Sequence, residues 1–212
     1  KTIWQKSREE LLQELDSTPE GLTGAEAASR VLYSAGITNV RVEHVGGNLT
    51  DHFDPRTNVI RLSDSVYDSA SVASVGVAAH EAGHAVQHAV GYGPIRFRQF
   101  LIPISRFGST LAIPLVFIGL LLPVQYDFVV TIGIVFYSLS VLFELVTLPV
   151  EFNASNRAIR ALEESGMLYG EELDGAKKVL RAAAMTYLAA TFTALASLLR
   201  LLVIVGNRRG RD

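Results

Sequence analysis

Apolar residues are concentrated in the second half of the chain, in three long stretches. Residues 104–122, 128–150 and 185–205 each contain a single charged residue. Each stretch has about the 20 residues that a helix needs to cross the hydrocarbon core of a bilayer. The pattern therefore predicts three transmembrane helices, in preference to a buried helical hairpin in a soluble core.

The first two apolar stretches are separated only by the turn of residues 123–127, and this spacing predicts an antiparallel hairpin. The chain then crosses the bilayer and returns to the side where it started. The larger group of basic residues lies on that side: Arg96, Arg98, Arg106, Arg157, Arg160, Lys177, Lys178 and Arg181. The positive-inside rule places this side in the cytoplasm, although three crossings then put Arg208, Arg209 and Arg211 outside.

The first half of the chain shows shorter, alternating patterns. Residues 1–20 are charged and amphipathic, and Thr23-Gly24-Ala25-Glu26 is a capping-box signature for a helix that ends near Gly36. Residues 40–45 and 59–62 are typical of strands, each bounded by a turn. We expect a small sheet, in which residues 59–62 form either an edge strand that pairs with an extended peptide or an ordinary hairpin strand.

A helix of small and apolar residues is predicted for residues 71–90, and it contains the sequence His80-Glu81-Ala82-Gly83-His84. The four-residue spacing puts His80 and His84 on one face, about 6 Å apart along the axis. Two imidazoles at that spacing can bind one tetrahedral Zn²⁺, and Glu81 can take a proton from a zinc-bound water. The alternative is a pair of core histidines bonded to other groups.

A catalytic zinc needs a third protein ligand. His88 lies about 12 Å from His80 along a continuous helix, which excludes it. Gln87 stands where a glycine would let a downstream histidine fold back. Glu151 follows the second apolar stretch and returns to the side of the histidines. Pro149 predicts a new helix with Glu151 in its first turn, where an acid is also favoured without any metal.

Composition narrows the chemistry further. The chain has no cysteine, which excludes disulfides and thiol chemistry, and its formal net charge of -2 does not point to a partner. We find no repeat, no phosphate-binding loop and no basic–aromatic patch for nucleic acid. Asp51, His52 and Asp54 form a second polar cluster, and His52 is a candidate for the rim of the cleft.

Four motifs in this order resemble those of the YugP-like neutral zinc metallopeptidases of bacterial membranes, over nearly all of the chain. The motifs are Gly21-Leu22-Thr23-Gly24-Ala25-Glu26, Leu49-Thr50-Asp51-His52-Phe53-Asp54-Pro55-Arg56-Thr57, Val77-Ala78-Ala79-His80-Glu81-Ala82-Gly83-His84 and Leu148-Pro149-Val150-Glu151-Phe152-Asn153-Ala154-Ser155. The resemblance implies an integral membrane protein with a zincin-type core and with His80, His84 and Glu151 as zinc ligands. It also implies a further transmembrane helix before Lys1.

The stretch around Glu151 is also distantly similar to the third-ligand motif of the HtpX-like and CAAX-prenyl membrane proteases. Those families carry an aspartate four residues after the glutamate, where it supports a ligand histidine. Here the position is Ser155, which can bond a ring N–H but supplies no charge. Asn153 and Arg157 are further candidates for support of the ligands or contact with the substrate.

The predicted fold is a mainly α membrane protein with a small β-sheet, in which a zincin-like core of the gluzincin type is fused to transmembrane helices. We divide the chain into four segments. Residues 1–100 hold the amino-terminal helices, the sheet and the histidine helix, and residues 101–150 form the transmembrane hairpin. Residues 151–184 form the third-ligand helix and the helix after it, and residues 185–212 form the third transmembrane helix and a basic tail.

We predict a membrane-embedded zinc endopeptidase that binds one Zn²⁺ and cleaves protein or peptide substrates near the membrane surface, with Glu81 as general base. We expect it in the bacterial cell membrane, with no nucleic-acid partner, and the oligomeric state stays open. One alternative is a zinc-stabilised membrane scaffold or quality-control adaptor with little or no proteolysis. A transporter would need polar residues through the bilayer, where only Glu144 and Arg200 qualify.

Overall fold

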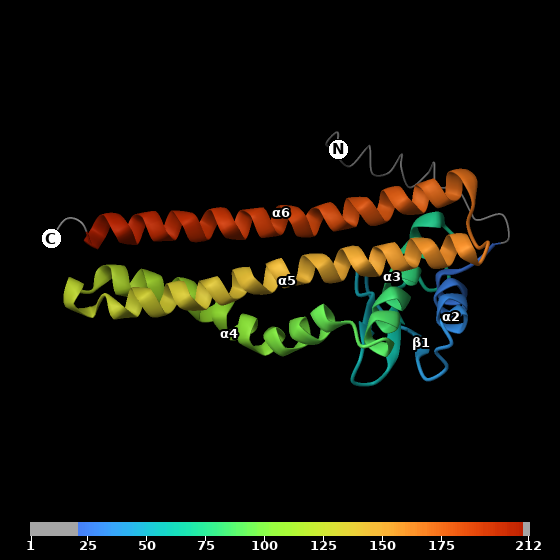
Figure 1. The fold of residues 1–212 in the computed structure, drawn as a ribbon, viewed down its shortest axis with the longest axis horizontal. Coiled ribbons are helices and arrows are strands. Elements are labelled where there is room, and N and C mark those ends of the chain that lie inside the picture. The colour runs from blue at the N-terminus through green and yellow to red at the C-terminus, as the bar shows by residue number, and fades with distance from the viewer. Residues whose placement is uncertain (1–20, 210–212) are drawn as a thin grey trace. The chain divides into compact units, whose positions relative to one another are not determined.

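The computed structural model describes residues 21–209, so the amphipathic residues 1–20 and the end of the basic tail lie outside the described part. The chain is mainly helical, with one small three-stranded sheet (Figure 1). It divides into two compact units. The first comprises the described residues up to Tyr92 together with Glu151–Ala184, and the second comprises Gly93–Val150 and the described residues from Met185 onward.

Helix α2, Gly24–Ser34, begins with the predicted capping box. The Thr23 hydroxyl accepts a hydrogen bond from the Glu26 backbone N–H, and the Glu26 carboxylate accepts one from the Thr23 backbone N–H. These two bonds satisfy backbone donors that a helix start leaves open. The helix ends before Gly36, whose φ of +69° is a backbone conformation that favours glycine.

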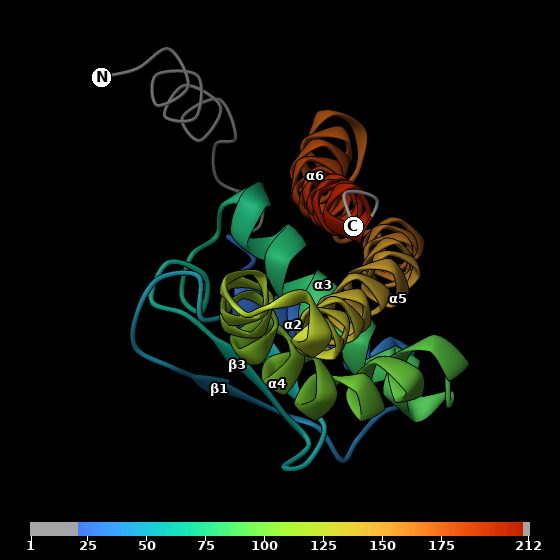
Figure 2. The same ribbon diagram turned by 90° about the vertical axis from the view of Figure 1, so that its left-hand side faces the viewer.

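The sheet has the order β1-β3-β2, formed by β1 (Arg41–His44), β2 (His52–Asp54) and β3 (Val59–Leu62). Strand β1 pairs with β3 in parallel and β2 pairs with β3 antiparallel, and Figure 2 shows β1 beside β3. Strand β3 is therefore central, and the prediction that it could be an edge strand for a substrate is wrong. Its apolar side chains are completely buried, as suits a strand with a neighbour on each side.

The polar cluster near β2 stabilises loops of the sheet. The Asp54 carboxylate accepts hydrogen bonds from the Arg56 backbone N–H and the Thr57 hydroxyl in the turn between β2 and β3. The Asp51 carboxylate accepts hydrogen bonds from the backbone N–H and the hydroxyl of Ser63. The Asp54 contacts form a short Asx turn of the kind common at hairpins, whereas Asp51 bridges to a residue twelve positions later. Sequence reasoning had not identified β2 as a strand.

Helix α3, Val72–Ala89, lies at the centre of the first unit. The Ser71 hydroxyl accepts a hydrogen bond from the Ser74 backbone N–H and caps its start. Figure 1 shows α2 and the strands gathered around α3, and both β2 and β3 contact it. Its small residues are buried and let neighbouring elements approach closely. This packing holds the histidine face of α3 in place.

Two helices are long and continuous. Helix α5, Phe128–Glu164, has 37 residues, and helix α6, Gly170–Arg209, has 40 residues. The prediction that a new helix begins at Pro149 is therefore wrong, because Pro149 lies inside α5. The separate helix expected before the third apolar stretch is likewise part of α6. A proline removes one backbone hydrogen bond and favours a kink, and neighbouring helix-forming residues can carry a helix through it.

The second unit holds α4, Gly93–Leu121, the short 3-10 turn Val124–Tyr126, and the apolar parts of α5 and α6. All three helices are long and apolar enough to cross a membrane, and only 22%, 17% and 11% of their most apolar windows are buried. Such large exposed apolar surfaces are typical of contact with lipid. Within the hairpin a Cβ at Gly119 would lie 2.6 Å from the Val130 side chain, so glycine permits the close approach of α4 and α5.

Candidate metal centre

Helix α3 presents the two histidines of the motif on one face, as their spacing predicts. The centroids of the His80 and His84 rings are 4.7 Å apart, and the ring planes are inclined by 83°. His84 is buried and His80 is half-buried. Two polar rings in such surroundings need partners for their nitrogens.

Glu151 on α5 supplies that partner. Its Oε2 atom lies 3.1 Å from His80 Nε2 and 3.5 Å from His84 Nε2, and its side chain is buried. Helix α5 comes this close because α3 has a glycine at the contact: a Cβ at Gly83 would lie 2.6 Å from the Ala154 carbonyl oxygen. The structure thus brings together the three residues that the sequence predicts as ligands.

These three side chains fit a zinc ion. One ligand atom from each of His80, His84 and Glu151 lies within 4.8 Å of the other two. Ligand atoms at about 2.0–2.1 Å from one tetrahedral ion lie about 3.3 Å apart, which agrees with the Nε2–Oε2 distances of 3.1 Å and 3.5 Å. Two imidazoles and one carboxylate are a donor set that zinc prefers, and it leaves one coordination position open.

The charges around the histidines favour a cation between them. Burial alone lowers the pKa of the His84 imidazole, but the hydrogen bond to Glu151 and the negative charges of Glu81 and Glu151 outweigh it and raise that pKa above its ordinary value. Glu81 is half-buried beside His80 in the sequence. The site therefore stabilises positive charge at the Nε2 atoms, where a metal ion would bind.

The other ring nitrogen of each histidine is also bonded. The Ser155 hydroxyl lies 3.1 Å from His80 Nδ1, and the Gln87 side-chain oxygen lies 3.0 Å from His84 Nδ1. Bonds of this kind orient ligand histidines and leave Nε2 for the metal. Ser155 was a candidate for this position from the sequence, whereas Gln87 was missed. The sequence feature that could have identified Gln87 is its position on a buried helix, three residues after the candidate ligand His84.

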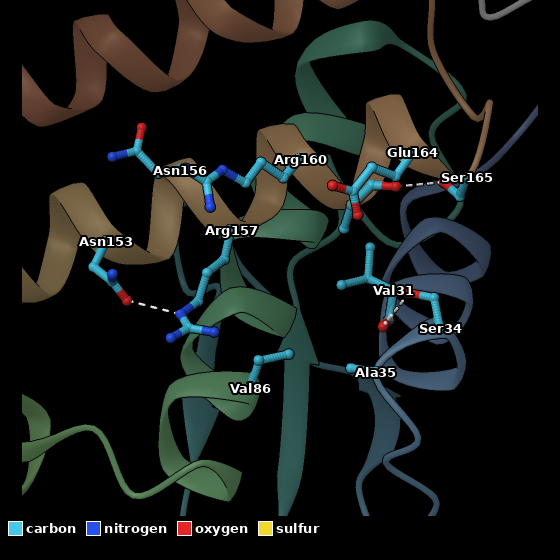
Figure 3. Close-up of a pocket in the computed structure, with 11 residues that line it drawn as sticks. Val31, Ser34, Ala35, Val86, Asn153, Asn156, Arg157, Arg160, Glu164 and Ser165 are labelled. Atoms are coloured by element: carbon cyan, nitrogen blue, oxygen red, sulfur yellow. Dashed lines mark hydrogen bonds between the residues drawn. The ribbon is translucent and has the colours of Figure 1, made fainter.

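Asn153 and Arg157 extend the polar contacts away from His84. The Gln87 amide nitrogen donates a hydrogen bond to Asn153 Oδ1 over 3.0 Å, and Arg157 Nε donates to the same oxygen over 2.8 Å. Figure 3 shows Arg157 on α5 beside Asn153, with a dashed line for the hydrogen bond between them.

Arg157 also lines a cavity of about 510 Å³ between α2, α3 and α5 in the first unit. Its polar lining residues are Ser34, Asn153, Asn156, Arg157, Arg160, Glu164 and Ser165. The cavity holds none of the three candidate ligands.

His52 and His88 are not part of the group of candidate ligands. His52 Nδ1 lies 2.7 Å from the Thr50 carbonyl oxygen, and its ring is exposed on the edge strand β2. The His88 ring packs edge-on against Phe53 at 5.9 Å. The exclusion of His88 by its distance along the helix agrees with this position.

The chain is similar to known zinc metallopeptidases over most of its length. Residues 5–206 match the family described as "Putative neutral zinc metallopeptidase", and the chain belongs to this family. It is 45% identical over 192 residues to the "Putative membrane protease YugP" of Bacillus subtilis (strain 168), which covers 91% of this chain and 84% of that protein. No solved structure gives a significant match. The family implies zinc, and the three apolar helices indicate a membrane protein.

Proposed function

We propose that this protein is a membrane-embedded zinc-dependent endopeptidase that cleaves protein substrates at or near the membrane surface. The convergence of the His80, His84 and Glu151 ligand atoms, with Glu81 on the same helical turn, carries this proposal. A helix with two histidines and a glutamate from a later helix also supports a zincin-like core of the gluzincin type. Membership of a zinc metallopeptidase family supports the same activity.

The proposed mechanism gives each residue a separate role. His80, His84 and Glu151 would hold one zinc ion per chain, which supplies a Lewis acid to polarise the scissile carbonyl and acidify a water. Within residues 21–209 the Glu81 carboxylate makes no hydrogen bond or ion pair, so it is available to take a proton from the attacking water. The same carboxyl group then returns that proton to the leaving amine as the C–N bond breaks.

A zinc-stabilised scaffold or adaptor explains the site less well. Structural zinc sites close all four positions with protein ligands, whereas the group found among the described residues has three members. A scaffold would also leave Glu81 without a role. We therefore retain the peptidase as the proposed function.

The substitution Glu81→Gln tests this proposal in the purified protein in detergent. We expect the variant to bind one zinc per chain, as the wild type does, and to hydrolyse peptides about 10²–10⁴ times more slowly, because a positioned general base is lost. Glu163→Gln is the matched control, since Glu163 is an exposed glutamate of α5 in the same unit. Peptide hydrolysis at the wild-type rate by Glu81→Gln would overturn the role of Glu81.

A further inference from the structure

A chain of polar side chains connects His84 to Arg157 through Gln87 and Asn153. The successive distances are 3.0 Å from His84 Nδ1 to Gln87 Oε1, 3.0 Å from Gln87 Nε2 to Asn153 Oδ1, and 2.8 Å from Asn153 Oδ1 to Arg157 Nε. All four residues belong to the first unit, on α3 and α5. The chain begins at a candidate zinc ligand and ends at the cavity of Figure 3.

Each bond in this chain fixes the direction of the next. Arg157 Nε can only donate, so Asn153 must turn its oxygen toward it. That oxygen also accepts the bond from Gln87, so Gln87 must present its amide nitrogen to Asn153 and its oxygen to His84. An oxygen at this position can only accept, and therefore the proton of the His84 ring must lie on Nδ1.

We propose that Arg157 is a positioning residue that acts through Asn153 and Gln87 to keep the proton of His84 on Nδ1, so that Nε2 faces the metal. If the side-chain amide of Gln87 or Asn153 were reversed, two donors or two acceptors would face each other at one of these hydrogen bonds. Gln87 is fully buried, which excludes water from replacing its partners. The role of Arg157 in metal binding rests on the proposed function. The direction of the hydrogen bonds from Arg157 to His84 does not depend on it.

The second histidine provides an internal contrast. His80 Nδ1 is paired with the Ser155 hydroxyl, which can donate or accept. Ser155 therefore supports the His80 ring without dictating where its proton lies. Between the two histidines, it is His84 whose Nδ1 partner has its polarity set by a permanently charged donor.

Two matched pairs of variants test the inference. Asn153→Asp keeps an oxygen for both Gln87 and Arg157, whereas Asn153→Leu has a similar size and no acceptor. Arg157→Lys keeps a group that only donates hydrogen bonds. Arg157→Gln introduces an amide that can donate or accept, so the orientation of the Asn153 amide is no longer fixed. The two readouts are the dissociation constant for zinc, by competition with a chelator, and the ¹⁵N–¹H signal of the His84 Nδ1–H group in the zinc-loaded protein.

We expect Asn153→Leu and Arg157→Gln to weaken zinc binding by about 10- to 100-fold, as is typical when a bond that orients a ligand is lost. Their Nδ1–H signal should move upfield and exchange faster with water. Asn153→Asp and Arg157→Lys should stay within about threefold of the wild-type constant and keep the signal, since the direction of the bonds is preserved.

A purely structural role would lower the melting temperature without a change in either readout, and that result would overturn the inference. If Asn153→Leu fails to fold, Arg157→Gln decides, because Arg157 is only half-buried. Neither readout depends on peptide hydrolysis. A changed Nδ1–H signal in a protein without peptidase activity would leave this inference standing and remove the proposed function.

Discussion

Ser155 contacts a candidate zinc ligand, His80, through a small neutral hydroxyl. Its hydroxyl lies within hydrogen-bond distance of His80 Nδ1, at 3.1 Å, and the side chain is buried. A neutral hydroxyl orients the ring but adds little to its basicity, whereas a carboxylate at this position would add both orientation and charge. The contribution of Ser155 to zinc binding should therefore be real but modest.

The substitution Ser155→Ala should weaken zinc binding by about tenfold, at the lower end of the range for groups that orient a ligand. Competition with a chromophoric chelator measures the dissociation constant. Ser29→Ala provides the control, because Ser29 is an exposed helical serine in the same unit whose hydroxyl bonds a backbone carbonyl. An unchanged constant in Ser155→Ala would show that this hydroxyl does not support the ligand.

The three candidate ligands could be named from the sequence and lie together in the structure, whereas the groups that contact them were only partly predicted. His80 and His84 share a helical turn, so a spacing of four residues is sufficient to pair them. Gln87 contacts His84 directly, but its own orientation depends on a hydrogen bond to Asn153, which lies 66 residues later. Local sequence contains no information on that contact. From the sequence, Gln87 was therefore noted only because it stands where a turn-forming glycine would be needed.

At the scale of the elements, the candidate metal centre depends on how closely α3 approaches α5. Gly83 lies at this contact, where a Cβ would be 2.6 Å from the Ala154 carbonyl oxygen. That carbonyl belongs to the backbone of α5 and cannot move independently of the helix. Gly76 lies on the same helix, and a Cβ there would meet Ala176 at an ordinary distance of 3.7 Å.

These two glycines allow one substitution to be compared in two surroundings. Gly83→Ala should destabilise the protein by about 1–3 kcal/mol through overpacking, and should weaken zinc binding because His84 moves relative to Glu151. Gly76→Ala should be neutral or stabilise by up to about 1 kcal/mol, because alanine favours a helix over glycine. Thermal unfolding in detergent, with and without zinc, measures both. Equal stability of the two variants would argue against a tight α3–α5 contact.

The boundaries of the elements were predicted less well than the elements themselves. A proline followed by helix-forming residues looks the same in sequence whether it starts a helix or lies within one. At Pro149 the helix continues, so Glu151 sits in the middle of α5 and not in a first turn. Strand β3 was predicted at its observed residues, but its neighbours depend on pairings that the local pattern does not encode.

At the scale of the whole molecule, the first unit is assembled from two segments that the apolar hairpin separates. His80 and Glu151 are 71 residues apart, so the site is complete only when both segments have folded together. The sequence could predict this return, because two apolar stretches with a short turn bring the chain back to its starting side.

Arg208 offers a physical reason for the basic residues that oppose the positive-inside rule. Its guanidinium donates hydrogen bonds to the carbonyl oxygens of Gly119 and Leu122, at the end of α4 in the same unit. The last carbonyls of a helix lack partners and carry partial negative charge, which a cation neutralises. Arg208 therefore has a structural role at this end of the hairpin and is a weak indicator of the cytoplasmic side.

The absence of cysteine in this chain allows membrane sidedness to be tested with single cysteines placed in it. Gln125 lies in the turn between α4 and α5, Asn207 lies near the end of α6, and Thr38 lies between α2 and β1; all three are exposed. With the zinc site facing the cytoplasm, Gln125→Cys and Asn207→Cys should react with a membrane-impermeant thiol reagent in intact bacterial cells. Thr38→Cys should react only after the membrane is permeabilised.

The pattern of labelling separates the two parts of this proposal. Labelling of Thr38→Cys alone in intact cells would keep the three crossings and reverse the orientation, so the zinc site would face outward. Labelling of Gln125→Cys and Thr38→Cys from the same side would contradict the crossing itself, because an odd number of apolar helices must lie between these positions. The return of Glu151 to the histidines needs two crossings, so the second result would require α4 and α5 to lie outside the bilayer and would remove the membrane-surface location of the site.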